Sequence, residues 1–185
     1  MGTSPPIASS AGPIAWLSAH QAQRDVIDGL ARFTTWEALW NECPRGDWLL
    51  GIAERIGVEH TDLVRAAVAA ARVADPVPEA TALLDLVEAG ADVAEATKKL
   101  ENTTAPDPSS DATIRAAVAV GLGVADRAVL PSAAAAAVES IMLASIDCGF
   151  ELAMRWAHDK TATAVRTALP WSLVAPCVAR LSDRG

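Results

Sequence analysis

The chain has 185 residues, of which 40 are alanine, with a formal net charge of −8 and six Trp, two Phe and no Tyr. This length suits one compact domain, or at most two small ones, and an apolar fraction of 51% is enough for a core, which excludes global disorder. The acidic balance argues against binding to nucleic acid or to an anionic membrane, because both require a basic face.

The first thirteen residues, Met1–Pro13, are rich in Pro, Gly, Ser and Thr, and we predict a flexible N-terminal arm there. From residue 14 to residue 185 we expect a single all-α domain, since alanine is abundant and runs of β-branched or aromatic residues are scarce. The polar segment Glu101–Ser110, which contains two prolines, is the best candidate for an internal boundary.

Apolar residues recur at helical spacing along most of the chain, and Pro, Gly or a capping residue marks the breaks. The predicted helices cover Ile14–Phe33, Trp36–Cys43, Trp48–Ile56, Thr61–Ala74, Glu79–Ala89, Ala91–Leu100, Ala112–Leu130, Ser132–His158 and Lys160–Leu169. Pro170 and Pro176 divide the remaining residues into short pieces. The pattern predicts a compact bundle of seven to nine helices, and helical hairpins are one arrangement that fits it.

The predicted helix Ser132–His158 is apolar on nearly every face between Ala133 and Ala144, which indicates the most buried helix of the fold. We expect no membrane span. The longest uncharged apolar stretches, Ala128–Val138 and Thr167–Ala179, are shorter than the roughly 20 residues that a helix needs to cross a bilayer.

The sequence contains no recognisable catalytic or metal-binding signature. The three cysteines, Cys43, Cys148 and Cys177, are widely spaced, which is typical of reduced thiols in the cytoplasm and not of a disulfide framework. No two histidines have metal-ligand spacing, and no CxxC motif, GxSxG motif or phosphate-binding loop occurs, so we expect no metal and no cofactor. A non-enzymatic role is favoured, with an enzyme left open.

Three of the six tryptophans lie within thirteen residues, and these are Trp36, Trp40 and Trp48. One interpretation is structural: the indoles anchor the core, Asp47 caps the helix that follows, and Arg45 pairs with Glu42 or Asp47. The other is that the cluster and Arg45 form a recognition surface, because Trp and Arg are enriched at interface hot spots.

A second candidate site is acidic. Glu88, Asp92 and Glu95 are spaced by four and three residues, which would align them on one face of a helix. An acidic helical face is commonly solvated and structurally neutral. It is also the kind of surface on which a basic partner would dock.

The segment Trp36–Val58, WEALWNECPRGDWLLGIAERIGV, resembles immunity proteins of bacterial polymorphic toxin systems. The matching residues are Trp40, Cys43, Pro44, Arg45, Asp47, Trp48, Leu49 and Leu50. The chain departs from that pattern at Ala70-Ala71-Arg72, where a Cys-Ala-Arg triplet would be expected. The resemblance implies an all-α fold and a non-enzymatic role, in which the protein binds and blocks a cognate toxin without a cofactor.

These observations predict a cytoplasmic protein that sequesters a protein partner, such as a basic toxin, through an acidic helical surface. The expected binding residues are Trp36, Trp40, Arg45, Asp47, Trp48, Glu88, Asp92 and Glu95. Two alternatives remain. A helical bundle could enclose a small apolar ligand near Met142, Cys148 or Met154, as a sensor or a biosynthetic enzyme, or the chain could self-assemble into a homo-oligomer as a structural subunit.

Overall fold

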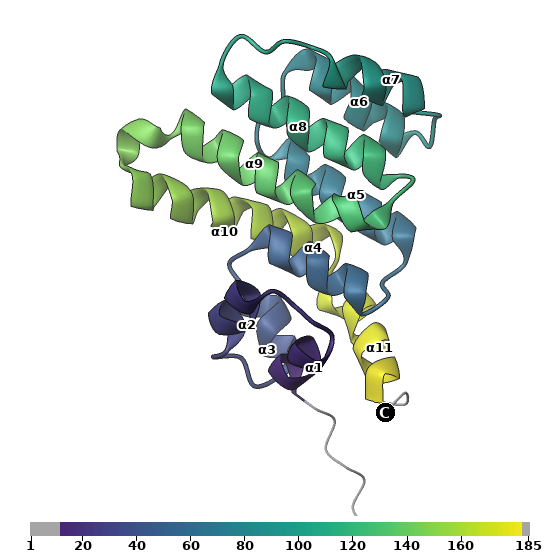
Figure 1. Ribbon diagram of the computed structural model, residues 1–185, viewed down its shortest axis with the longest axis vertical. Helices are drawn as coiled ribbons and strands as arrows, with labels where there is room; N and C mark the ends of the chain where they lie inside the picture. Colours follow the sequence, from purple (N-terminus) through teal and green to yellow (C-terminus); the bar gives the residue numbers. More distant parts are fainter. Residues whose placement is uncertain (1–11, 183–185) are drawn as a thin grey trace, which may run out of the picture.

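The computed structural model describes residues 12–182, which form eleven α-helices and no strand (Figure 1). The helices are α1 (Pro13–Ala19), α2 (Arg24–Leu30), α3 (Trp36–Glu42), α4 (Gly46–Arg55), α5 (His60–Arg72), α6 (Pro78–Glu88), α7 (Ala94–Glu101), α8 (Pro108–Gly123), α9 (Leu130–Ala144), α10 (Phe150–Ala168) and α11 (Trp171–Ser182). Two short 3-10 turns, η1 (Arg127–Val129) and η2 (Ile146–Cys148), flank α9. The all-α prediction is therefore confirmed.

The predicted count of seven to nine helices is too low, because two long predicted helices are each divided and because the C-terminal residues form one helix, α11, instead of short pieces. Pro176 lies inside α11, so the expected break there is wrong, and the predicted Lys160–Leu169 helix is the second half of α10. The predicted Ile14–Phe33 helix becomes α1 and α2, separated by a turn in which Gln21 has φ of 55°. The predicted Ser132–His158 helix becomes α9 and α10. These run back along each other because Gly149, with φ of 94°, adopts a conformation that side chains disfavour.

Other expected breaks agree with local chemistry. The Thr35 hydroxyl accepts a hydrogen bond from the Ala38 N–H and caps α3. Asp107 caps α8 by accepting a hydrogen bond from the Ser110 N–H. Helix α8 therefore begins at Pro108, four residues before the expected start at Ala112. The segment between α7 and α8 is a loop, as expected, and the helices on either side of it pack together. Of the predicted arm, Gly12 and Pro13 are described; Pro13 begins α1, and residues 1–11 lie outside the described part.

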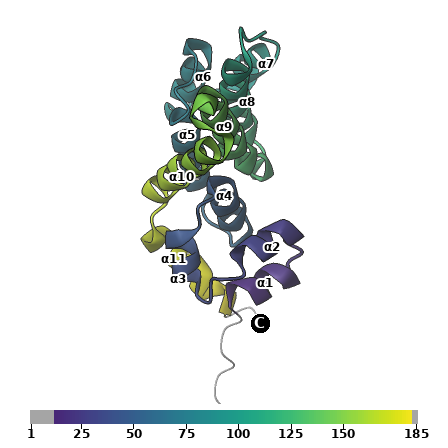
Figure 2. The same ribbon diagram turned by 90° about the vertical axis from the view of Figure 1, so that its left-hand side faces the viewer.

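Helix α9 lies at the centre of the fold and packs against α4, α5, α8 and α10 (Figures 1 and 2). Half of its buried positions are alanine, including Ala133, Ala134 and Ala137, which are fully buried. Small side chains let the neighbouring helices approach closely. This confirms that the stretch from Ala133 to Ala144 belongs to a core helix with neighbours on several sides.

The segment Arg127–Ala144 is long and apolar enough, by length and composition, to cross a membrane, with a mean hydropathy of 1.3. The uncharged stretch Ala128–Val138, on which the expectation of no membrane span was based, is only part of this longer apolar segment. In the fold, most of the segment is α9, and its apolar character is that expected of a helix surrounded by four others.

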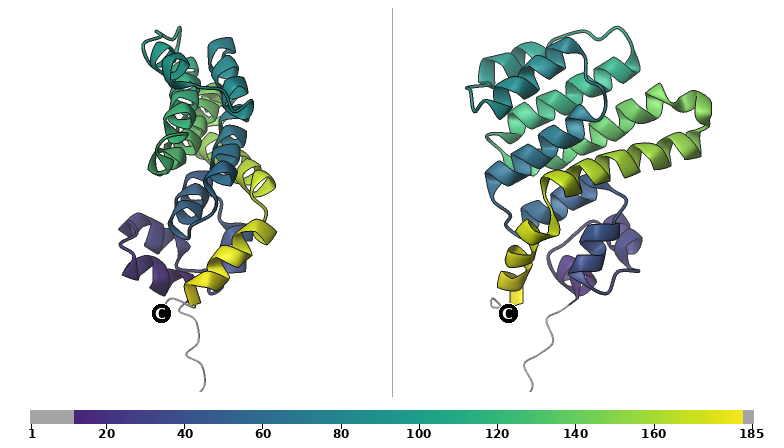
Figure 3. Two further views of the ribbon diagram at one scale, coloured as in Figure 1. Left: turned by 90° about the vertical axis from the view of Figure 1, so that its right-hand side faces the viewer. Right: turned by 180° about the vertical axis from the view of Figure 1, so that it is seen from behind.

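The helices form two regions. Helices α4–α10 stack on one another, with α6 and α7 at one end of the molecule and α4 near the other (Figure 1). Helices α1–α3 and α11 lie below α4 at that second end (Figures 2 and 3). The Trp-rich segment connects the two regions, because α3 belongs to the lower one and α4 to the stack.

Candidate functional site

Much of the Trp-rich segment is a structural junction. Trp40 is only 1% exposed, and its indole N–H donates a hydrogen bond to the Leu169 carbonyl at 3.0 Å, which joins α3 to the end of α10. Cys43 is fully buried, and its carbonyl accepts a hydrogen bond from Arg166 at 2.6 Å. For Trp40 the structure therefore favours the core-anchor interpretation over the recognition surface.

The Cys43 thiol is unsuited to nucleophilic chemistry. Burial raises the pKa of this thiol above its ordinary value of 9.0, although a backbone hydrogen bond at Arg45 acts in the opposite direction. The thiol also donates a hydrogen bond to the Arg45 carbonyl, which favours the protonated form. A raised pKa keeps the thiol protonated, and the thiolate is the reactive form. Cys43, Cys148 and Cys177 are all free thiols, of which Cys148 alone is exposed.

Gly46 sets the distance between α4 and α10. A Cβ atom at this position would lie 2.9 Å from the Thr161 backbone carbon. Real Cβ atoms do not approach backbone so closely, so only glycine allows α4 to begin against α10 at this distance. The Gly46 that interrupts the Trp-rich segment is thus explained by packing.

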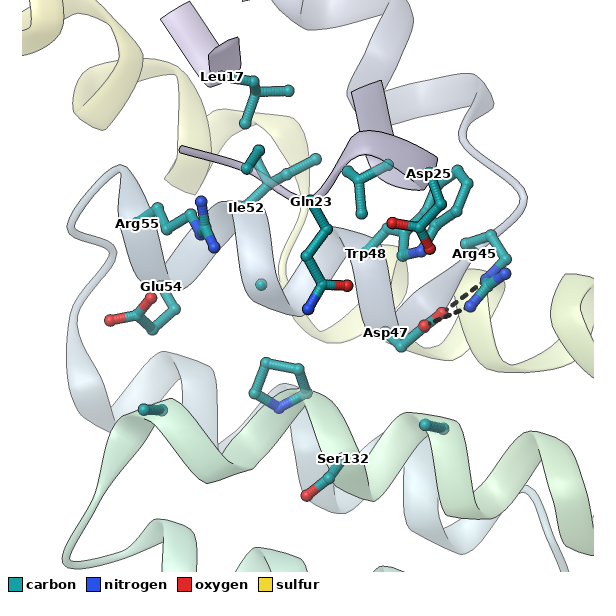
Figure 4. Close-up of a pocket in the computed structure, with 16 residues that line it drawn as sticks. Leu17, Gln23, Asp25, Arg45, Asp47, Trp48, Ile52, Glu54, Arg55 and Ser132 are labelled. Atoms are coloured by element: carbon teal, nitrogen blue, oxygen red, sulfur yellow. Dashed lines mark hydrogen bonds and ion pairs between the residues drawn. The ribbon is translucent and has the colours of Figure 1, made fainter. Parts of the chain in front are cut away.

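The remaining residues of the segment, Arg45, Asp47 and Trp48, form a connected unit. Arg45 donates two hydrogen bonds to the Asp47 carboxylate, from Nε at 2.9 Å and from a terminal nitrogen at 2.6 Å (Figure 4). This bidentate pair raises the pKa of the Arg45 guanidinium, so the charge of Arg45 is permanently balanced by Asp47. The guanidinium also lies 4.4 Å from the centre of the Trp48 ring, within cation–π distance.

Two sequence expectations about this unit have different outcomes. Arg45 pairs with Asp47, which was one of the two expected partners. The expectation that Asp47 caps the following helix is wrong, because α4 begins at Gly46 with Arg45 in the capping position and no side-chain cap. The Asp47 carboxylate is instead occupied by Arg45.

Arg45, Asp47 and Trp48 line a cleft with a volume of 430 Å³ (Figure 4). One wall comes from the end of α1 and the start of α2, another from α4, and the third from the start of α9. Its apolar lining includes Val26, Ile52 and Pro131. Its polar lining residues are Gln23, Asp25, Arg45, Asp47, Glu54, Arg55 and Ser132.

The cleft has an acidic character once its internal pairs are considered. Arg45 is neutralised by Asp47, and Arg55 donates a hydrogen bond to the His20 carbonyl at 3.1 Å. Glu54 has a distant ion pair with Arg127, at 3.5 Å, and Asp25 is exposed. The cleft therefore presents the Asp25 and Glu54 carboxylates beside the Trp48 ring, together with the Arg55 guanidinium, whose bond to a neutral carbonyl leaves its charge in place. With Arg45 and Asp47 included, the lining carries one excess negative charge.

The other predicted binding residues lie away from this cleft. Trp36 is partly buried and packs edge-to-face against Trp16, with ring centres 5.6 Å apart; it does not line the cleft. Trp16 in turn stacks on His20 at 3.9 Å. Trp36 and Trp40 therefore serve the packing of α1, α3 and α10, whereas Trp48 alone of the cluster reaches the cleft.

The expected alignment of Glu88, Asp92 and Glu95 on one helix is wrong. Glu88 is the last residue of α6, Asp92 lies in the turn that follows, and Glu95 is in the first turn of α7. Glu88 forms an ion pair with Arg72, and the Asp92 carboxylate accepts a hydrogen bond from the Ala94 N–H. These residues lie at the opposite end of the molecule from the cleft (Figure 1).

Sequence reasoning missed the residues that complete the cleft. Asp25, Glu54 and Arg55 carry no local signal, because the cleft is assembled from three segments that are far apart in the chain. It also missed His158 on α10, whose Nδ1 atom is buried without a hydrogen-bond partner. Desolvation by burial lowers the pKa of His158, and the nearby Arg45 charge acts in the same direction.

Comparison with protein families, with curated proteins and with solved structures finds no match for this chain. Within residues 12–182, no group of three or more His, Cys, Asp or Glu side chains is arranged to hold a metal ion. The function of the chain is therefore inferred from the geometry and charge of the cleft.

Proposed function

We propose that this protein is a non-enzymatic binding protein that inhibits a partner protein, in the manner of the immunity proteins that its Trp-rich segment resembles. The cleft formed by α1, α2, α4 and α9 would receive a basic side chain from a protruding loop of that partner. The observation that supports the proposal is the convergence of Arg45, Asp47 and Trp48 on one cleft with the Asp25 and Glu54 carboxylates.

Charge favours a basic partner. The whole chain has a net charge of −8, and the only cation of the Trp-rich unit is paired within the unit. A positive residue entering the cleft would meet Asp25 and Glu54 as well as the Arg55 guanidinium, and the excess of one negative charge in the lining favours a cation over an anion. Long-range attraction would also accelerate the encounter of oppositely charged proteins.

The rigidity of the cleft wall favours binding as well. The Trp48 ring lies against the backbone of Gly29, where an added Cβ would be only 2.3 Å from the ring. The Arg45 guanidinium, 4.4 Å from the ring centre, also contacts the ring. A tryptophan held in one position makes a good anchor, because little side-chain freedom is lost when a partner docks.

A second candidate function has its own observation. A groove of 510 Å³ lies between α5, the α6–α7 turn and the end of α8, and most of its lining is apolar, including Val64, Val68, Val87 and Val124. This volume falls within the range of small-molecule sites. Met142, Cys148 and Met154, near which an apolar ligand was expected, do not line this groove. An apolar ligand held in the groove would support the sensor or biosynthetic alternative at a different place, and titration with a fluorescent apolar dye would detect it.

Paired bait variants test the inhibitor proposal. The cleft variant carries Asp25→Asn and Glu54→Gln, and the matched control carries Asp92→Asn and Glu95→Gln, so both remove the same charge from opposite ends. Wild type and both variants are used to retain proteins from a lysate of the source cells, and each retained protein is purified and its affinity measured at several salt concentrations.

We expect one basic partner that binds wild type and control equally, and binds the cleft variant at least about tenfold more weakly, with an affinity that falls as salt rises. Equal affinity of that partner for the cleft variant would contradict the assignment of the cleft. Loss of binding in the control variant alone would transfer the site to the α6–α7 turn.

A further inference from the structure

The end of the α9–α10 hairpin carries an unusual concentration of exposed apolar side chains. Eight large hydrophobic residues are exposed in the described part of the chain, and four of them fall between residues 146 and 156: Ile146, Phe150, Leu152 and Trp156. The hairpin end extends past the neighbouring helices in Figure 1 and in the right-hand view of Figure 3. Exposed apolar patches of this kind mark interaction surfaces.

Leu152 and Trp156 form the centre of this surface. They are 51% and 46% exposed, and they lie one turn apart on the same face of α10. The opposite face of α10 carries the buried residues Ala153, Ala157 and Thr161, so Leu152 and Trp156 point away from the core. They are not required to close the fold.

We propose that this face of α10 binds a second copy of the same chain, with the two α10 helices antiparallel around a two-fold axis. If the two-fold axis passes between residues 153 and 154, a residue of one copy lies opposite the residue of the other copy whose number brings the sum of the two to about 307. Leu152 of one copy then faces Trp156 of the other, and the relation holds in both directions, as a two-fold interface requires.

The charges of the hairpin end fit the same register. Glu151 faces Arg155 of the second copy, and both residues lie on the same flank of α10 beside Leu152. Asp159 faces the N-terminal end of the partner helix at Gly149, where a negative charge is favourable. Glu151 precedes Arg155 by one helical turn, so reversal of one copy brings these two unlike charges together in both directions. This self-complementarity favours a second copy over a uniformly charged partner.

The surface is ready for such packing. The Lys160 ammonium lies 4.0 Å from the centre of the Trp156 ring, which holds the ring in one orientation. Glu151 and Arg155 are both exposed and make no ion pair within the described chain, so both are free to pair across the interface.

The first test measures self-association by sedimentation equilibrium over a dilution series. We expect the wild type to dimerise and Trp156→Ala to weaken the dimer by about 30-fold or more, as for an aromatic hot spot. Leu173→Ala on α11 is the matched control, because Leu173 is also exposed, and it should leave the dimer unchanged. A wild type that remains monomeric throughout the series overturns the proposal, even if it binds lipid vesicles.

The second test examines the register. Glu151→Arg and Arg155→Glu each place like charges opposite each other, and each should weaken the dimer by about tenfold. The double variant restores opposite charges and should restore association. A mixture of the two single variants should form mixed dimers more tightly than either forms alone. If the single variants dimerise as tightly as wild type, or the mixture shows no preference, the antiparallel register is wrong.

Discussion

The α3–α4 junction and the end of the α9–α10 hairpin use the same kinds of residue in opposite ways. At the junction, Trp40 is buried, its N–H has a partner, and nearby charges are paired within the chain. At the hairpin end, Trp156 is half exposed, and the adjacent Glu151 and Arg155 make no ion pair within the described chain. A cluster of tryptophans in sequence is therefore weaker evidence for a binding surface than a single tryptophan that the fold leaves half exposed.

The packing of the α3–α4 junction also shapes the cleft. Three of the expected binding residues lie at its edge, yet they are held there by the same packing that buries Trp40 and Cys43. The junction thus fixes the position of Trp48 and Asp47, and the acidic residues that would contact a partner come from elsewhere, on α2 and the far end of α4. A motif can be structural while it still shapes a functional surface.

The largest expected contrast is between Trp40→Ala and Trp156→Ala. Removal of the Trp40 ring leaves a cavity in the core and deprives the Leu169 carbonyl of its donor, so the free energy of unfolding should fall by about 3–5 kcal/mol. Trp156→Ala removes an exposed ring and should lower it by less than about 1 kcal/mol. Urea unfolding followed by circular dichroism, at a concentration where the chains are monomeric, measures both.

Similar losses for the two tryptophan variants would remove the distinction between the regions. It would mean that the α9–α10 hairpin end is as tightly packed as the junction. The proposed dimer surface would then be part of the folded core.

A sharper contrast within α4 comes from two glycines. Gly46→Ala forces a methyl group against the Thr161 backbone and should destabilise the fold by about 1–3 kcal/mol. Gly51→Ala is the control, since the nearest atom to its added Cβ is Pro131 Cγ at 3.8 Å. In a helix interior this substitution should stabilise by up to about 1 kcal/mol. Opposite signs in thermal unfolding would confirm that the start of α4 is the constrained end.

Much of the helical fold could be predicted from periodicity and capping, because signals such as Thr35 and Gly90 act over a few residues. Two helix breaks were missed, one between α1 and α2 and one at Ser145–Gly149. At the second, no proline occurs, and the Ala-rich sequence before it offers little contrast between faces. Periodicity cannot locate the end of a helix that is apolar all round.

The candidate site was only half predictable. Arg45, Asp47 and Trp48 stood out because they are adjacent in the sequence, but Asp25 and Glu54 reach the cleft only through the packing of α2 against α4. The error over Asp47 has a local cause. A carboxylate at a helix start commonly caps it, and here the guanidinium two residues earlier takes both of its oxygens.

The smallest expected effect concerns His158, which lies beneath the junction on α10. Burial lowers its pKa in the folded protein from the ordinary value of 6.5, and Arg45 adds to this while Asp47 opposes it. The unfolded chain therefore takes up a proton at higher pH than the folded one. As pH falls from 7 through 6.5, protonation stabilises the unfolded state, and the free energy of unfolding decreases until the folded-state pKa is passed.

This linkage distinguishes a closed junction from a solvated one. The His158→Gln variant should lose less stability than wild type over that pH interval. Chemical denaturation at a series of pH values gives the slopes, and carboxylate titration affects both proteins alike. Equal slopes for wild type and His158→Gln would show that water reaches the imidazole. The junction that positions Trp48 and Asp47 would then be open, and the cleft wall would lack the rigidity on which its role as an anchor depends.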